Sequence, residues 1–228
     1  MSTVGVVIPT LNEACNLPEL LGDLREVALP LHVIVADGGS NDDTPALAQA
    51  GGATVVHTAR GRAVQMNGGA RVCGAEWLCF LHADVRLPEN ARHDFEHLVR
   101  DPAAEAAVGR LAIDADGWWF RVLERGARVR DRLVGLSYGD QGLLVRRALF
   151  DLIGGFPDLP VLEDVAFNRA VRRHVVLRRL GSPLLVSARR WKKEGLYWTW
   201  IRNVAVLSAY LAGVSPRRLS RWYRPHRA

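Results

Sequence analysis

Two aspartates follow hydrophobic segments of the sequence at positions where a carboxylate could meet a ligand. Asp37 comes after the apolar segment 31–36 and before two glycines that permit tight backbone turns, and its carboxylate could accept hydrogen bonds from a ligand. Asp84 follows the apolar segment 76–81, where a carboxylate can bind a hard divalent cation that also holds phosphate oxygens. Each aspartate also has a structural interpretation, as part of a turn before a helix or as a solvated loop acid.

Glu163 and Asp164 form another acidic position, after the glycine-containing break at 154–157. They lie at the start of the segment 162–173, whose pattern predicts a helix. Acids in the first turn stabilise a helix by about 0.3–1 kcal/mol through the helix dipole. A carboxylate here could instead be a general base that removes the proton from an attacking hydroxyl.

A basic segment with several glycines lies between Asp37 and Asp84. Arg60, Gly61 and Arg62 precede a predicted helix over 62–75 that is rich in small residues and also carries Gln65 and Asn67. The start of such a helix can receive a phosphate or a nucleoside. The sequence contains neither a P-loop motif nor GxGxxG, which argues against kinases, GTPases and dehydrogenases.

Alternating strand and helix patterns must position these residues. Apolar segments at 4–8, 31–36, 53–57 and 76–81 predict strands, and helices are predicted after Asn16, from Thr44, over 62–75 and over 88–100. This alternation predicts an α/β, Rossmann-like fold with a mostly parallel central sheet and helices on both faces. Polar clusters at 10–13, 37–44 and 82–84 follow three of the strands. Because ligands bind at the carboxyl ends of strands in such sheets, we expect the site at this edge.

The second half of the sequence is less regular. Strands are predicted over 106–113, 142–145, 175–180 and 184–187, and helices over 118–133, 162–173 and 196–213. Cys15, Cys73 and Cys79 lack CxxC spacing, so we expect buried small residues and neither a disulfide framework nor a zinc knuckle.

The net charge of +6 is unevenly distributed over the 228 residues. Segment 189–228 holds ten lysines or arginines and one acid, Glu194, so the first 188 residues carry a net negative charge. A basic tail of this kind favours binding to an anionic surface. The N-terminus shows no secretory signal pattern, which favours a cytoplasmic protein, peripheral at the inner face of the cell membrane.

Segment 195–214 within this tail is mostly apolar. Arg202 near its centre would cost about 2.5–3.5 kcal/mol in a membrane-spanning helix, which argues against spanning. The aromatic and basic residues of the segment are typical of an amphipathic helix at a membrane interface. A helix that covers the sheet or contacts a second copy is the other interpretation.

Seven short segments together resemble a known family. They are, in chain order, VVIPTLNEA (6–14), VADGGSNDDT (35–44), GRAVQMNGGA (61–70), FLHADVRLP (80–88), GDQGLLVRR (139–147), GGFPDLPVLEDV (154–165) and SARRW (187–191). The chain resembles the inverting family 2 glycosyltransferases of the GT-A fold and, more narrowly, the radical-SAM/selenodomain-associated transferase subgroup. The segments keep the family's order across nearly the whole chain, so they are more specific together than singly.

The resemblance implies a role for each matching residue. The nucleotide-binding residues would be Pro9, Thr10, Glu13, Asp37, Arg62, Asn67, Gly69, His82 and Ala83. Asp84 would bind a divalent metal, Mn²⁺ or Mg²⁺, and Asp164 would be the catalytic base. The acceptor would contact Tyr138, Asp140, Gln141, Glu163 and Trp191.

The sequence departs from the family pattern in two places. His82 replaces the first acid of the family's DxD metal motif, which bears on metal dependence. Segment 188–191 retains only the end of the QxxRW motif, which argues against processive polymer synthesis.

By this resemblance, residues 1–190 form a GT-A domain with a nucleotide-sugar half, 1–105, and an acceptor half, 106–190, followed by a basic helical tail, 191–228. The implied reaction transfers a sugar from a nucleotide diphosphate sugar, by default a UDP-sugar, to an acceptor hydroxyl with inversion. Expected partners are this donor, a lipid-linked acceptor, a membrane surface and a second copy in a homodimer, but no nucleic acid. Two alternatives stay open: a degenerate sugar-nucleotide-binding or membrane-scaffold protein, and a sugar-phosphate nucleotidylyltransferase.

Overall fold

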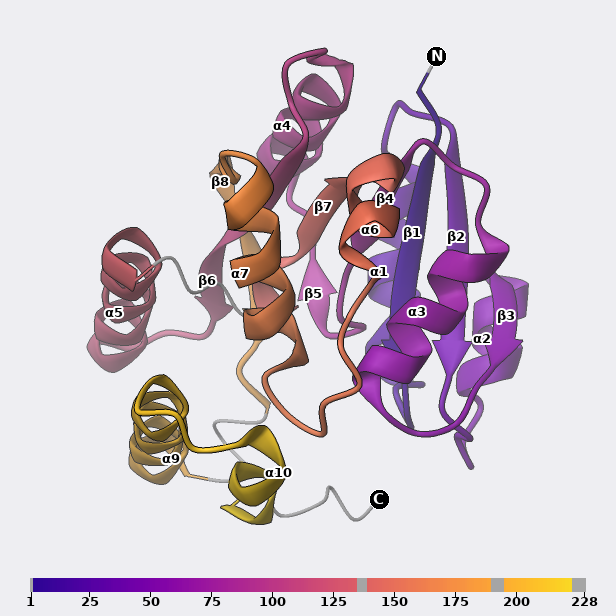
Figure 1. Cartoon of the computed structure of the whole chain (residues 1–228). Coiled ribbons are helices and arrows are strands. Elements are labelled where there is room, and N and C mark those ends of the chain that lie inside the picture. The colour runs from indigo at the N-terminus through magenta and orange to yellow at the C-terminus, as the bar shows by residue number, and fades with distance from the viewer. Residues whose placement is uncertain (1, 135–138, 190–194, 223–228) are drawn as a thin grey trace.

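An eight-stranded sheet with strand order β3-β2-β1-β4-β7-β6-β8-β5 runs through the molecule (Figure 1). The computed structural model describes residues 2–134, 139–189 and 195–222. The strands are β1 (Val4–Thr10), β2 (Leu31–Asp37), β3 (Thr54–His57), β4 (Trp77–Phe80), β5 (Val85–Arg86), β6 (Ala106–Asp114), β7 (Leu143–Arg146) and β8 (Arg178–Ser187). The helices are α1 (Leu17–Arg25), α2 (Thr44–Ala50), α3 (Arg62–Val72), α4 (Glu89–Arg100), α5 (Trp118–Val134), α6 (Arg147–Ile153), α7 (Glu163–His174), α9 (Leu196–Leu211) and α10 (Pro216–Leu219), with 3-10 turns η1 (Gly139–Gln141) and η2 (Ser220–Trp222).

The first four long strands form the parallel part of the sheet, as predicted. β1 pairs with β2 and β4, and β2 pairs with β3, all in parallel. Nearly every residue of β1 and β4 is buried, because helices cover both faces of these strands. This burial explains why both strands are continuous apolar segments in the sequence rather than alternating ones.

The second half of the chain makes the sheet mixed. β7 lies between β4 and β6 and is antiparallel to both, and β5 is antiparallel to β8. Parallel pairing therefore accounts for four of the seven strand pairs, with β6 and β8 as the fourth. The α/β Rossmann-like fold with helices on both faces is confirmed, with more antiparallel pairing than the sequence indicated.

β8 corrects the prediction of two strands at 175–180 and 184–187. It is a single strand that passes through Gly181 and Pro183, residues that usually mark a break. The ladder with β6 absorbs them by a register shift between Val108 and Arg110. The Ser182 N–H is satisfied outside the ladder by Asp94 Oδ2 at 2.6 Å. Helix α6 and the two-residue strand β5 had no counterpart in the predicted elements.

Two hydrophobic clusters lie on opposite faces of the sheet. One joins the sheet to α1, α2 and α4, and the other joins it to α3, α6 and α7. β1 supplies both, because Val6 and Ile8 point to the first cluster while Val7 points to the second. Cys73 and Cys79 are buried as expected, whereas Cys15 is exposed.

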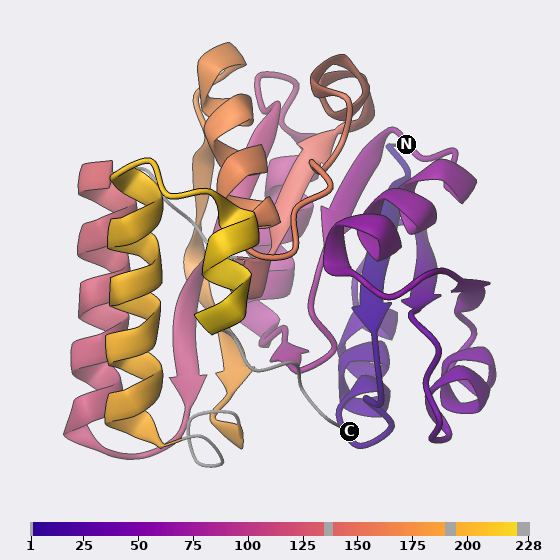
Figure 2. The same ribbon diagram turned by 60° about the horizontal axis from the view of Figure 1, so that its bottom comes forward.

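The helices α5, α9 and α10 lie beside the sheet rather than on its central strands. Figure 2 shows α5 and α9 side by side, and Trp119 of α5 contacts Trp200 of α9 with ring centroids 6.3 Å apart. A small apolar cluster joins α9 and α10 to residues 161–165 at the start of α7. Within the described residues, none of the helices has the length and apolarity needed to cross a bilayer.

Candidate functional site

The loops after β1 and β2 are tied to each other by hydrogen bonds. The Asn12 N–H donates to Ser40 Oγ at 2.9 Å, and the Asn41 N–H donates to Asn12 Oδ1 at 2.8 Å. The Glu13 N–H donates to Oγ1 of the fully buried Thr44 at 2.8 Å. Asn12 has a φ of 57°, a left-handed conformation that asparagine tolerates. The two loops therefore form one fixed wall at the carboxyl ends of neighbouring strands.

Asp37 holds this wall from inside, because its carboxylate is only 1% exposed. Oδ1 accepts from the hydroxyls of Thr10 and Ser40, and Oδ2 accepts from the N–H groups of Gly39 and Ser40. Burial raises the pKa of Asp37, but the hydrogen bonds from Ser40 and Gly39 outweigh it, so the pKa is lowered. The structure shows a carboxylate that fixes the loop; contact of Thr10 and Asp37 with a nucleotide stays a prediction.

Gln65 is a buried polar residue of this site that the predicted set of site residues did not contain. From the first turns of α3, its Nε2 donates to the carbonyl oxygens of Thr10 at 2.7 Å and Ala36 at 2.8 Å. It thereby joins the ends of β1 and β2. The sequence signal that could have identified Gln65 is its place on a helix face that otherwise carries small and apolar residues.

Asn67 and Gly69 were predicted to line a nucleotide-binding loop, but both lie inside α3. The Asn67 amide donates to the Phe156 carbonyl at 2.8 Å and accepts from the Phe156 N–H at 2.9 Å. A Cβ on Gly69 would lie 2.5 Å from Val7 Cγ1, so glycine is needed for α3 to pack on β1. Both residues position elements around the site, and their contact with a nucleotide stays a prediction.

Glu13, Asp84 and Arg189 come together from three separated segments. Arg189 Nη2 donates to Glu13 Oε2 at 3.2 Å, and the Ser187 N–H donates to the Asp84 carbonyl at 3.0 Å. Burial raises the pKa of Glu13, and the negative charge of Asp84 adds to this, while hydrogen bonds from Asn16 and Arg189 oppose it. The predicted site residues did not include Arg189, because no sequence pattern links it to a loop 176 residues earlier.

Asp84 was predicted to hold a divalent metal, and this role stays a prediction. Among the described residues, no group of three or more His, Cys, Asp or Glu side chains is arranged to hold a metal ion. A single half-buried carboxylate nevertheless suits Mg²⁺ or Mn²⁺ when the substrate's phosphates provide further oxygen ligands. Pro9, at the end of β1, is half-buried, and Ala83, next to Asp84, is buried.

Asp164 and His82 meet at Gly139. The Asp164 Oδ2 accepts from the Gly139 N–H at 2.5 Å, and Oδ1 accepts from the Val165 N–H at 2.7 Å. A Cβ on Gly139 would lie 2.9 Å from His82 Nε2 and 3.2 Å from Asp164 Oδ2, so both side chains lie against this glycine. The proposed base is thus adjacent to the loop that carries Asp84.

Glu163 lies beside Asp164 but is only 3% exposed. Its Oε1 is 3.7 Å from Nη1 of Arg62, the first residue of α3. Burial raises the pKa of Glu163 to about 7, the charge of Asp164 adds to this, and Arg62 opposes it. Arg62 therefore links the start of α3 to the start of α7.

The residue before this pair, Leu162, has a φ of 63°, which costs a residue other than glycine about 1–3 kcal/mol. Its side chain is buried in the cluster formed with Val206 of α9 and Leu219 of α10. This packing holds the strained backbone that aims Glu163 and Asp164.

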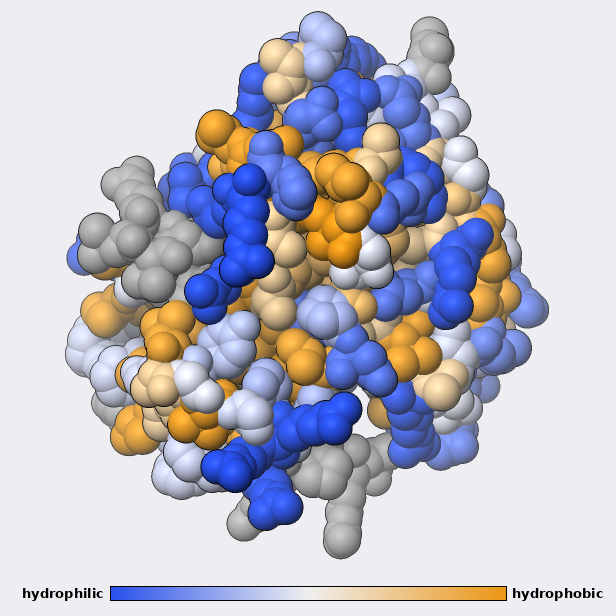
Figure 3. All heavy atoms as spheres, in the orientation of Figure 1, coloured by the Kyte–Doolittle hydropathy of each residue, from blue (hydrophilic) through white to orange (hydrophobic). Residues whose placement is uncertain are grey.

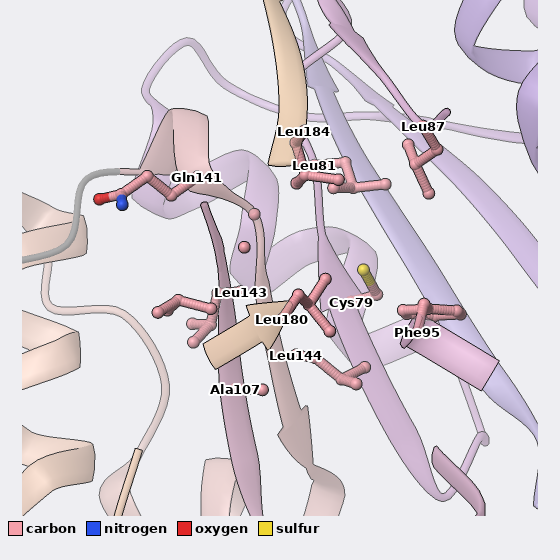
Figure 4. Close-up of a pocket in the computed structure, with 13 residues that line it drawn as sticks. Cys79, Leu81, Leu87, Phe95, Ala107, Gln141, Leu143, Leu144, Leu180 and Leu184 are labelled. Atoms are coloured by element: carbon pink, nitrogen blue, oxygen red, sulfur yellow. The ribbon is translucent and has the colours of Figure 1, made fainter. Parts of the chain in front are cut away.

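The predicted acceptor residues are only partly described. Tyr138 and Trp191 lie outside the described residues, and of Asp140 only the backbone, in η1, is described. Gln141 is buried and borders an apolar cavity of about 20 Å³ between β4, β6, β7 and β8 (Figure 4). The cavity has room for about one water molecule and is lined by core residues, so its volume is too small for a sugar or a nucleotide.

The fold, with a parallel Rossmann-like half and a mixed-sheet half, is the α/β architecture of the GT-A type. The sequence model of Glycosyl transferase family 2 matches residues 5–177. The chain belongs to this family.

Solved structures share the fold. A mannosyltransferase from Pyrobaculum calidifontis in complex with GDP-Man and Mn²⁺ has a TM-score of 0.64 and 24% identity, covering 94% of this chain and 66% of that chain. Glucosyl-3-phosphoglycerate synthase from Mycobacterium tuberculosis, with Mn²⁺ and UDP, has a TM-score of 0.55 and 21% identity, covering 78% and 70%. TarS from S. aureus in complex with UDP-GlcNAc has a TM-score of 0.62 and 16% identity, covering 82% and 58%.

A curated relative at higher identity is the 4,4'-diaponeurosporenoate glycosyltransferase of Staphylococcus haemolyticus. It is 31% identical over 119 residues, which make up 49% of this chain and 31% of that protein. The chain therefore spans less than a third of the length of this relative, and the match concerns the shared domain.

Proposed function

We propose that this protein transfers a sugar from a nucleotide diphosphate sugar to an acceptor hydroxyl with inversion, and that Asp164 is the base. The observation that carries the proposal is the position of Asp164 against Gly139 and His82, beside the loop with Asp84. A base in this place faces the edge of the sheet where the donor site is expected. Family membership supports the same reaction class.

The proposed chemistry is a single in-line displacement. The acceptor oxygen forms a bond to the anomeric carbon while the bond from that carbon to the diphosphate oxygen breaks, and one displacement inverts the configuration. The acceptor proton moves to Asp164, and the bonding electron pair leaves with the diphosphate. For this attack the base must lie within hydrogen-bond reach of the acceptor hydroxyl. The hydrogen bond from the Gly139 N–H fixes the carboxylate of the proposed base, Asp164, in one position.

Asp84 is proposed to hold Mg²⁺ or Mn²⁺, which when bound would offset the negative charge on the departing diphosphate. Arg62 forms an ion pair with Glu163, the neighbour of Asp164, and Arg189 forms one with Glu13, whose pKa is raised by the charge of Asp84. Support for the metal comes from two of the related folds, which contain Mn²⁺. We propose UDP as the nucleotide, and GDP is the first alternative because one related fold binds GDP-Man.

The acceptor is proposed to be a hydroxyl on a lipid-linked molecule at the inner face of the cell membrane, and nucleic acid is not a proposed partner. This rests on the aromatic and basic tail helix, which packs on the residues directly before Asp164. The narrower placement in the radical-SAM/selenodomain-associated subgroup rests on the motifs of the sequence and is likewise a proposal.

Calorimetric binding of UDP, GDP, CDP and dTDP, each with and without Mn²⁺, tests the proposal. Wild type should bind one of them in a metal-dependent way, and Asp84→Ala should lose that dependence. Asp116→Ala, an exposed acid of the β6–α5 loop, is the matched control and should bind like wild type. Binding of no nucleotide by the folded wild type would reject the function, and metal-independent binding would remove Asp84 from its role.

A second candidate is a catalytically degenerate sugar-nucleotide-binding protein, and His82 in place of an acid in the metal motif favours it. The two candidates differ in turnover. A degenerate protein would bind nucleotide but release no free sugar or product from the matching nucleotide sugar, whereas the transferase would show at least slow hydrolysis of the donor.

A further inference from the structure

Exposed hydrophobic side chains are concentrated on one part of the molecule. Of the twelve large hydrophobic side chains exposed among the described residues, nine lie on α5, α9 and η2. They are Trp118, Val122, Val129, Trp198, Trp200, Ile201, Val204, Leu211 and Trp222. We call these nine residues the apolar surface. Figure 3 shows orange and pale spheres over α5 and α9, next to strongly blue spheres over α10.

Among the described side chains, the outer side of α9 is uncharged and mostly apolar, and Ser208 is its one exposed polar residue. Trp198, Ile201, Val204 and Leu211 follow one another at spacings of three or seven residues, so they share one helix face, and Trp198 is 63% exposed. Arg202, which is the single charged residue in the sequence of α9, is half-buried on another side. A helix with water on its outer side normally carries charged residues there. The outer side of α9 is therefore built for an apolar surrounding.

α5 continues this surface with a different pattern. Trp118 is 71% exposed, and Val122 and Val129 follow it at helical spacing on the exposed side. Arg121, Arg125 and Arg128 are exposed beside them. Alternation of apolar residues with arginines along one helix is typical of helices that lie in the headgroup region of a bilayer.

Most of the charges on the described parts of α5, α9, α10 and η2 are positive, and the exposed acids Asp114 and Asp116 lie before α5 rather than on it. Among the described side chains of α5, α9 and α10, the single acid is Glu124, which is buried and accepts hydrogen bonds from the Ile113 N–H and Arg121. Arg217, Arg218 and Arg221 add exposed cations on α10 and η2. Two copies of this surface placed face to face would bring arginines together, which disfavours a homodimer through it. Anionic phosphates at a membrane surface would instead be attracted to these cations.

We infer that α5 and α9 together form the surface by which this protein binds an anionic phospholipid bilayer, with the apolar surface at headgroup depth and the arginines on lipid phosphates. This goes beyond a tail helix acting alone, because α5 ends more than fifty residues before the tail begins and supplies half of the exposed arginines among the described side chains of α5, α9, α10 and η2. It deepens the proposed function, because α9 and α10 pack on Leu162 and Val165, which flank the base. Bilayer binding would place the base near lipid-borne hydroxyls.

Co-sedimentation of the full chain with vesicles of phosphatidylglycerol or of phosphatidylcholine tests the inference without any substrate. Wild type should bind phosphatidylglycerol at least tenfold more tightly than phosphatidylcholine, and less tightly as salt rises. Ile201→Glu with Val204→Glu should weaken binding at least tenfold. The matched control is Leu152→Glu with Val176→Glu, which changes two hydrophobic residues that are even more exposed but lie outside the apolar surface, and it should bind like wild type.

The contribution of α5 is tested by Arg125→Glu with Arg128→Glu, compared with Arg169→Glu with Arg173→Glu on the exposed side of α7. The first pair should lower binding to phosphatidylglycerol vesicles at least fivefold, and the second should not. Circular dichroism establishes that each variant is folded.

Equal vesicle binding by wild type and the Ile201/Val204 variant would overturn the inference. So would a wild-type dimer in light scattering that this variant converts to monomer while vesicles bind neither protein. Because nucleotide binding is measured separately, failure of bilayer binding leaves the transfer reaction untouched, and failure of nucleotide binding leaves the bilayer surface untouched.

Discussion

The two halves of the site are held in place by different forces. In the half formed by β1 to β4, loop backbones are fixed by buried polar side chains, as Asp37 and Gln65 show. In the half formed by later elements, Asp164 is positioned by the backbone N–H groups of Gly139 and Val165 and by the apolar packing of Leu162. Buried polar networks tolerate few substitutions, because each lost partner leaves an unsatisfied group, whereas apolar packing accepts changes that conserve volume. The half formed by β1 to β4 is therefore the more constrained one, and the half formed by the later elements is the one that can be altered.

The largest expected effect is on the rate of sugar transfer and concerns the proposed base, Asp164. Asp164→Asn should lower the rate of sugar transfer about 10²–10⁴-fold, because an amide cannot take the acceptor proton. Single-turnover transfer, once the donor is identified, measures this. Nucleotide affinity measured by calorimetry should stay within about twofold of the wild-type value. The loops after β1 and β2, where the nucleotide is proposed to bind, do not depend on this carboxylate. Asp151→Asn on α6 is the control, since its exposed carboxylate is away from Gly139. Full turnover by Asp164→Asn would remove the base from its role.

Glu163 gives the next effect, on stability as a function of pH. Its pKa is raised from 4.5 to about 7, so the folded protein binds a proton that the unfolded chain has lost between these values. Stability should therefore fall as pH rises from about 4.5 to 7 and level off above, by about 3 kcal/mol at the pKa shift shown. Glu163→Gln should remove this decline in urea unfolding, and Glu89→Gln, on an exposed residue, should keep it. A wild-type curve that rises over this range would contradict the assignment.

A substitution at Thr44 tests the polar network that fixes the loops after β1 and β2. Thr44→Val keeps the shape but leaves the Glu13 N–H without its acceptor, which should cost about 1–3 kcal/mol of unfolding free energy and weaken nucleotide binding. Thr54→Val is the matched control on exposed β3, where about 0.5 kcal/mol or less is expected. Equal losses in both variants would show that the loops do not depend on this network.

Arg189 should show the smallest effect. Its ion pair with Glu13 is 53% exposed on the arginine side, so Arg189→Gln should change stability by less than about 1 kcal/mol. Nucleotide affinity should fall less than about fivefold, and less at high salt. Arg173→Gln serves as the control. A loss of a hundredfold or more in affinity would instead place Arg189 directly on the ligand.

Much of the first half could be predicted from local pattern, and less of the second. Buried parallel strands such as β1 show as continuous apolar segments, and polar residues after them mark the sheet edge. The position of β7 between β4 and β6 has no local signal, because strand order depends on distant pairing. The pairing of Arg189 with Glu13 and the burial of Glu163 against Arg62 likewise join residues about 100 or more positions apart. The sequence pattern identified Asn67 as a candidate site residue. In the structure its amide oxygen accepts a hydrogen bond from the Phe156 N–H of another loop, a contact that only the fold reveals.

The left-handed backbone at Leu162 has a consequence for how the protein is made. The packing that holds it comes from Val206 and Leu219, which leave the ribosome some forty to sixty residues after Leu162 itself. Chains fold from the N-terminus as they are synthesised. A nascent chain would thus first form the wall made by the loops after β1 and β2. The backbone before the proposed base, Asp164, would be held in place only when α9 and α10 dock. Activity would be the final property to appear during synthesis, and the first to be lost when the C-terminus is trimmed.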